Sequence, residues 1–166
     1  MSTPATTSQD GLRSRMPDPN RFIPELGGIA GGLFKATANG SVPQTTISLV
    51  QLRAGQIVGN TYHVVGQAGN LRKAGDTEER IAAVASWRDA PFFTDAERVA
   101  LELVEAVLTP NPSGERVPDE LYAKASAHYD TKAMWTLTMV IGQMCFWIPV
   151  ALIGKPIPGK EQRWSE

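Results

Sequence analysis

The sequence contains very little cysteine, since Cys145 is the one thiol among 166 residues. A single cysteine excludes a disulfide within the chain, and it excludes zinc sites and iron–sulfur clusters that need several thiolates from one chain. An excess of charge of either sign is lacking too, because 16 Lys and Arg face 17 Asp and Glu, which gives a net charge of −1. Without a basic field to attract phosphates, we expect no nucleic acid among the partners.

An apolar leader is lacking as well, because residues 1–20 are rich in Ser, Thr, Pro and Asp. We therefore expect a cytoplasmic protein that is not bound to a membrane. The one segment of membrane-spanning length is 134–153, which carries two Thr, a Gln, a Gly and a Pro without flanking basic clusters. A buried or oligomer-interface helix explains this segment better than a membrane span.

The motifs of several large enzyme classes are also missing. The chain has no G-x-G-x-x-G, no G-x-x-x-x-G-K-[ST] and no G-x-S-x-G, so it offers no nucleotide-binding loop and no hydrolase elbow. The two histidines, His63 and His128, lack the short spacings that bind metals on one helix. We predict an absence of metal and cofactor.

Helical patterns fill the chain, and no stretch alternates apolar and polar residues over a strand's length. Thr94 and Glu97 predict a capping box, Asp130 predicts a cap of the last long helix, and Pro149 should bend or end that helix. The prediction is an all-α bundle of about six or seven helices. Its parts are a disordered N-terminal tail, a single helical domain and a C-terminal tail, at 1–17, 18–159 and 160–166.

The middle of the chain, Leu49–Val107, resembles the alkylhydroperoxidase D-like / carboxymuconolactone decarboxylase family. Its most specific segment is WRDAPFFTDAER at Trp87–Arg98, and the likeness continues more weakly through Val117–Ile141. The resemblance implies an all-helical fold, a small-molecule substrate, and a homo-oligomer, a trimer or hexamer, with the active site near subunit contacts.

The redox residues of that family are replaced in this chain. Its redox branch carries a Cys-x-x-Cys pair, a following His and a preceding Glu, and the matching positions here hold Asn60, His63, Gln67 and Ser48. A dithiol peroxidase needs an activated thiolate and a resolving thiol. We expect Cys145, in an apolar helix, to be buried and inert, so dithiol chemistry is not predicted.

The replacement residues form a second kind of candidate site. Asn60, His63 and Gln67 fall on one face of a helix, with His63 in its first turn. The positive end of the helix disfavours imidazolium, so His63 should be neutral and able to act as a general acid or base. Asn60 and Gln67 would hold an oxyanion, with Ser48 and Tyr62 as further polar contacts. A satisfied core histidine, with Asn60 only capping, is the structural alternative.

Aromatic and sulfur side chains of the last helix are candidate substrate contacts. Where related sequences carry a polar stretch, this chain has Cys145, Phe146 and Trp147. Trp135 lies earlier in the same predicted helix. If these residues face the site, they predict a pocket for a hydrophobic or aromatic compound. Plain core or interface packing explains them equally.

Three hypotheses for the function follow from these observations. The first is a cofactor-independent, non-redox enzyme of the lyase, isomerase, cyclase or decarboxylase type, acting on a small, largely apolar carbonyl or carboxylate compound with His63 as general acid/base. The second is a catalytically degenerate, small-molecule-binding or structural oligomer. The third is residual peroxidase-type activity.

Overall fold

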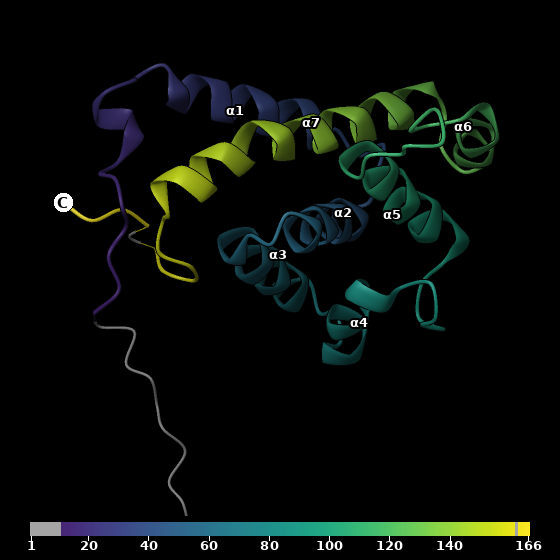
Figure 1. Ribbon diagram of the computed structural model, residues 1–166, viewed down its shortest axis with the longest axis horizontal. Helices are drawn as coiled ribbons and strands as arrows, with labels where there is room; N and C mark the ends of the chain where they lie inside the picture. The colour runs from purple at the N-terminus through teal and green to yellow at the C-terminus, as the bar shows by residue number, and fades with distance from the viewer. Residues whose placement is uncertain (1–10, 162) are drawn as a thin grey trace, which may run out of the picture.

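The protein is an all-helical bundle in the computed structural model, which describes residues 11–161 and 163–166 (Figure 1). No strand forms among these residues, and the prediction of an all-α fold is confirmed. The seven α-helices of the described chain are α1 (Leu26–Thr37), α2 (Gln44–Ile57), α3 (Thr61–Lys73), α4 (Glu78–Ala83), α5 (Asp95–Leu108), α6 (Asp119–Ser126) and α7 (Thr131–Gly154). Two short 3₁₀ helices, η2 (Pro19–Arg21) and η3 (Val84–Ser86), accompany them.

The central element is α2, which packs against α3, α5 and α7. One face of α2 carries Val50 and Ala54 into a core shared with α5, α6 and α7. Another face carries Leu49 and Leu52 into a second core with α3, α4 and η3, which includes Leu71. Because α2 is buried from both sides, its position is fixed by two sets of apolar contacts, and this fixes the helices around it.

The helix ends follow local capping chemistry. Thr94 and Glu97 form the predicted capping box, and Asp130 accepts a hydrogen bond from Ala133 N at 2.8 Å. At the start of α4, Thr77 rather than Asp76 is the N-cap, and its side chain accepts a hydrogen bond from Arg80 N. The Asp76 carboxylate instead pairs with Arg80 at 2.7 Å.

The last helix, α7, continues through Pro149 to Gly154 rather than ending at the proline. Proline removes one backbone donor. Burial of Ile148 and Ala151 on either side of it supplies the contacts that keep the helix continuous. By length and composition α7 could cross a membrane, but 39% of its most apolar window is buried inside the protein. Here α7 is a core helix, lying against α1 and α2.

The two ends of the described chain lie together (Figure 1). Ser14 and Ser165 exchange hydrogen bonds of 3.0 and 2.8 Å, and Pro17 forms an isolated β-bridge with Ser165. The first ten residues of the predicted tail lie outside the described residues. The described part of that predicted tail, residues 11–17, contacts the C-terminal segment through these hydrogen bonds.

Candidate active site

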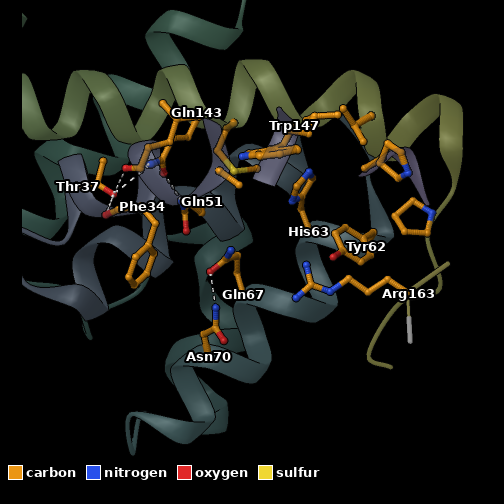
Figure 2. A pocket seen from close by; sticks show the side chains of 18 of the residues that line it. Phe34, Thr37, Gln51, Tyr62, His63, Gln67, Asn70, Gln143, Trp147 and Arg163 are labelled. Carbon is orange, nitrogen blue, oxygen red and sulfur yellow. Dashed lines mark hydrogen bonds between the residues drawn. The ribbon is translucent and has the colours of Figure 1, made fainter. Parts of the chain in front are cut away.

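A cavity of about 470 Å³ lies between α1, α2, α3, α7 and the C-terminal segment (Figure 2). Each helix contributes a stripe at helical spacing, for example Gln44, Ile47 and Gln51 from α2. The lining combines amide side chains with aromatic rings, and its described residues include no Asp or Glu. Such a mixture suits a small organic molecule that needs both apolar contact and hydrogen bonds.

His63 is held in this cavity by the crossing of α2 and α3. The two helices approach closely at Gly55, where a Cβ atom would lie 3.1 Å from Cβ of His63 and 3.2 Å from Val64 N. Asn60 caps α3, and its Oδ1 accepts a hydrogen bond of 3.0 Å from the backbone N–H of His63. Gly55 and the Asn60 cap together fix the position of the His63 backbone and Cβ atom, from which the imidazole extends.

The imidazole of His63 is buried yet chemically unengaged on one side. The residue is 8% exposed, and its Nε2 has no hydrogen-bond partner among the described residues. Burial lowers the pKa of His63 from its ordinary value of 6.5, while the nearby backbone of Trp147 acts in the opposite direction. Tyr62 contacts the ring edge-on, with centroids 5.4 Å apart. A neutral imidazole with an unpartnered Nε2 has the chemistry of a proton acceptor.

Gln67 is the predicted residue that accompanies His63 in the cavity. Its Oε1 accepts a hydrogen bond of 3.1 Å from Nδ2 of Asn70, as the dashed line in Figure 2 shows. With its oxygen engaged, the amide nitrogen of Gln67 remains to donate to a ligand. Tyr62 and Trp147, two of the predicted substrate contacts, also line the cavity.

The other predicted site residues lie away from this cavity. Asn60 lines a separate cavity of about 240 Å³, and its Oδ1 is used by the cap, so it positions His63 rather than a substrate. Ser48 is buried at 3% exposure, because it follows Ile47 on α2 and is turned about 100° from the cavity-facing stripe.

Three predicted contacts on α7 face the outside. Trp135 and Phe146 are 63% and 42% exposed, and Cys145 is exposed rather than buried. The reason is helical phase. The stripe of α7 that lines the cavity runs through positions 143, 144, 147, 150 and 151, which excludes 145 and 146. The expectation that Cys145 is inert through burial was therefore wrong.

A polar network that sequence reasoning missed crosses the cavity wall. Nε2 of Gln143 donates to Leu33 O at 2.5 Å and to Thr37 Oγ1 at 3.1 Å, and Gln51 donates to its Oε1 at 3.4 Å (Figure 2). These bonds join α7 to α1 and α2. The sequence did contain a signal for this network, because Gln143 is the one glutamine in the apolar run 134–153. A buried glutamine in such a run must find hydrogen-bond partners. No comparable signal marked Arg163 or Trp164, which also line the cavity.

Known proteins match this chain in sequence and in fold. The model of the "Carboxymuconolactone decarboxylase family" matches residues 26–106. The uncharacterized protein YdfG of Bacillus subtilis is 34% identical over 131 residues, which cover 79% of this chain and 88% of YdfG. The uncharacterized protein YnjA of Escherichia coli is 35% identical over 95 residues, 57% of this chain, and the match spans only half of YnjA.

Two solved structures share the fold. One is a protein of unknown function from Agrobacterium tumefaciens, described as a putative antioxidant defence protein AhpD, with a TM-score of 0.79 and 25% identity over 90% of this chain and all of the other. The second is the debrominase Bmp8 in complex with 2,3,4-tribromopyrrole, with a TM-score of 0.73 and 19% identity over 87% of this chain and 78% of Bmp8.

Proposed function

The chain belongs to the carboxymuconolactone decarboxylase family, and from that premise we propose that it is a cofactor-independent, non-redox enzyme that moves a proton on a small, largely apolar carbonyl or carboxylate compound. The reaction would be of the lyase, isomerase, cyclase or decarboxylase type. The observation that carries the proposal is the imidazole of His63, which is buried at the cavity with an unpartnered Nε2.

The proton-transfer step uses His63 as the base. Its neutral Nε2 takes a proton from the carbon next to a carbonyl, the C–H electron pair forms the new C=C bond, and the carbonyl oxygen becomes the oxyanion of an enolate. The amide nitrogen of Gln67 and the hydroxyl of Tyr62 line the same cavity and would donate to that oxygen. Return of the proton to another atom completes an isomerisation, and loss of a leaving group completes an elimination.

The position of the thiol supports acid–base chemistry over residual peroxidase activity. Cys145 is exposed on α7, outside the stripe that lines the cavity. A peroxidase of the dithiol type would need two thiols that meet. The fold itself accepts a small ring, because Bmp8 holds 2,3,4-tribromopyrrole. In this chain Trp147 and Met144 would supply the apolar contact for such a ring.

Exposed apolar side chains support a homo-oligomer, a trimer or hexamer, as the working form. Phe34 on α1 lines the cavity yet is 69% exposed, and Trp135 on α7 is 63% exposed. A second copy that covers these helices would remove this apolar area from water and close the cavity near Phe34. Light scattering of the purified chain measures the assembly, and a monomer at micromolar concentration would contradict this part of the proposal. The cytoplasmic location and the absence of a cofactor stay predictions.

The function is tested by deuterium exchange in deuterium oxide. A panel of aromatic and aliphatic keto acids and 1,3-dicarbonyl compounds is incubated with the wild type, His63→Gln and the matched control His128→Gln, and exchange at the carbon next to the carbonyl is followed by NMR. We expect catalysed exchange that falls by about 10²–10⁴-fold in His63→Gln and is unchanged in His128→Gln. Exchange at the buffer rate across the panel would instead favour a binding protein without catalysis. Full exchange in His63→Gln would refute the role of His63 as the base.

A further inference from the structure

Among the described residues that line the cavity, Arg163 carries the one formal charge, on its guanidinium. None of the described lining residues is acidic, the pKa of His63 is lowered by burial, and the remaining polar groups are amides and hydroxyls. Arg163 forms no ion pair with any acid in the described part of the chain. An arginine that faces a concave, acid-free surface without a partner of its own is suited to bind an anionic group of a ligand.

The backbone on either side of Arg163 is held in place. The carbonyl of Arg163 accepts a hydrogen bond of 2.7 Å from the N–H of Ile157. Trp164 packs directly on the backbone of α7, since a Cβ on Gly154 would lie 2.9 Å from Cζ3 of the indole. Ser165 is bonded to Ser14 in both directions. These contacts hold the backbone of this segment in place, and from it the Arg163 side chain reaches the cavity.

The guanidinium lies on the same side of the cavity as the candidate base. Figure 2 shows the Arg163 side chain running past Tyr62, with its guanidinium between Tyr62 and Gln67 and below His63. If the carboxylate of a ligand bound to this guanidinium, the adjoining carbon atoms would lie near the imidazole. The rest of the molecule would lie near Trp147. The arrangement thus orders three parts of one ligand: an anionic end, a reacting carbon and an apolar end.

We propose that Arg163 binds the carboxylate of the substrate. The substrates would then be small carboxylates with an aromatic or otherwise apolar body. This inference rests on the proposed function for the statement that the bound molecule reacts, but binding itself does not depend on it. Arg163 lies outside residues 26–106, which match the family model, so the assignment concerns this chain's own C-terminal segment.

A competing role for Arg163 is an intramolecular one. Arg163 also borders an adjoining depression of about 380 Å³, which Asp18, Glu161 and Glu166 line. None of these acids forms an ion pair with Arg163. Arg21 lines that depression but not the main cavity, and it therefore provides a matched control for the effect of a nearby positive charge.

The test compares two probes of nearly equal shape, phenylacetate and 2-phenylacetamide, by calorimetric titration at low salt and millimolar probe concentration. We expect the wild type to bind phenylacetate at least about tenfold more tightly than the amide, as a charge-assisted hydrogen bond implies. Arg163→Gln should reduce this ratio to about one without changing the affinity for 2-phenylacetamide. Arg21→Gln should leave both affinities unchanged. Arg163 is exposed, so its replacement does not disturb the core.

The inference is overturned by any of three results: no phenylacetate binding to the wild type, equal affinity for both probes, or a preference that survives in Arg163→Gln. His63→Gln separates this inference from the proposed function. If that variant retains the preference for phenylacetate while no compound of the panel exchanges deuterium, the carboxylate site stands and the catalytic proposal fails. If exchange depends on His63 but the preference is absent, the catalytic proposal stands and the role of Arg163 fails.

Discussion

Glu105 on α5 joins three donors from two other segments, so its replacement should destabilise the bundle strongly. Its Oε1 accepts hydrogen bonds from Arg53 Nε at 2.8 Å and from the indole Nε1 of Trp87 at 2.9 Å, and its Oε2 pairs with Arg88. The Glu105 side chain is 13% exposed and that of Arg53 is 20% exposed, whereas Arg88 is 60% exposed. The two partly buried contacts therefore dominate the energy.

The magnitude follows from what Glu105→Leu leaves behind. The indole N–H of Trp87, in a residue only 4% exposed, would lose its acceptor, at a cost of about 1–3 kcal/mol. Arg53 would lose its counter-ion in a partly buried setting, and exposed Arg88 adds less than about 1 kcal/mol. We expect a loss of about 3 kcal/mol in the free energy of unfolding. Glu105→Gln keeps an acceptor for Trp87 and should cost about half as much.

Urea unfolding followed by circular dichroism, at one fixed protein concentration, measures both variants. A loss below about 1 kcal/mol for Glu105→Leu, or equal losses for Leu and Gln, would refute the reasoning. The pH dependence gives a second check. Burial alone would raise the pKa of Glu105, but hydrogen bonds from Trp87, Arg88 and Arg53 outweigh it and lower the pKa from 4.5. The stabilisation is thus present above the unfolded pKa and is lost as pH falls through the folded one.

Three further replacements test the site and its support. Asn60→Ala removes the cap of α3 and should cost about 1 kcal/mol in urea unfolding; a loss of a few tenths or less would show that the cap is dispensable. Gly55→Ala forces a methyl group against His63 and should cost about 1–3 kcal/mol, whereas a neutral result would contradict the close crossing of α2 and α3. Burial raises the pKa of Tyr129 to about 12, and its hydroxyl donates to Ala96 O at 2.7 Å. An alkaline absorbance titration should show one tyrosine ionising near that pH, and Tyr129→Phe should remove that step; its persistence would contradict the assignment.

The helices could be predicted because their signals are local. A capping residue such as Thr94 or Asp130 accepts from an N–H three residues away, so a few neighbouring letters contain the whole interaction. The neutral state of His63 was expected from its place at a helix end, but the largest cause of its lowered pKa is burial, which depends on α2 and α7. Local patterns thus placed His63 in the first turn of a helix, but they did not indicate which side chains surround its imidazole.

The lining of the cavity could not be predicted from neighbouring letters. Cys145 and Phe146 adjoin Trp147 in sequence, yet a helix turns by about 100° per residue and only Trp147 faces the cavity. The same rotation separates Ser48 from Ile47. Arg163 lies in a segment that is held by the pairing of Ser14 with Ser165, 151 residues apart, and no local pattern records such a contact.

Protonation of His63 also links the site to stability. Because burial holds the pKa of His63 below its unfolded value of 6.5, the unfolded chain binds the proton more readily. The contribution of the neutral imidazole is therefore fully present above about pH 6.5 and is lost as pH falls through the folded pKa. His63→Gln should flatten this part of the stability curve, as urea unfolding at a series of pH values would show.

The most direct measurement of the central claim is an NMR titration of the two imidazole rings in the native protein. His63→Gln assigns the signals, because it removes one of only two histidines. We expect a pKa below 6.5 for the His63 ring, so that the ring is neutral at pH 7. A His63 ring that is already an imidazolium at pH 7 would contradict the claim that a neutral base faces the cavity.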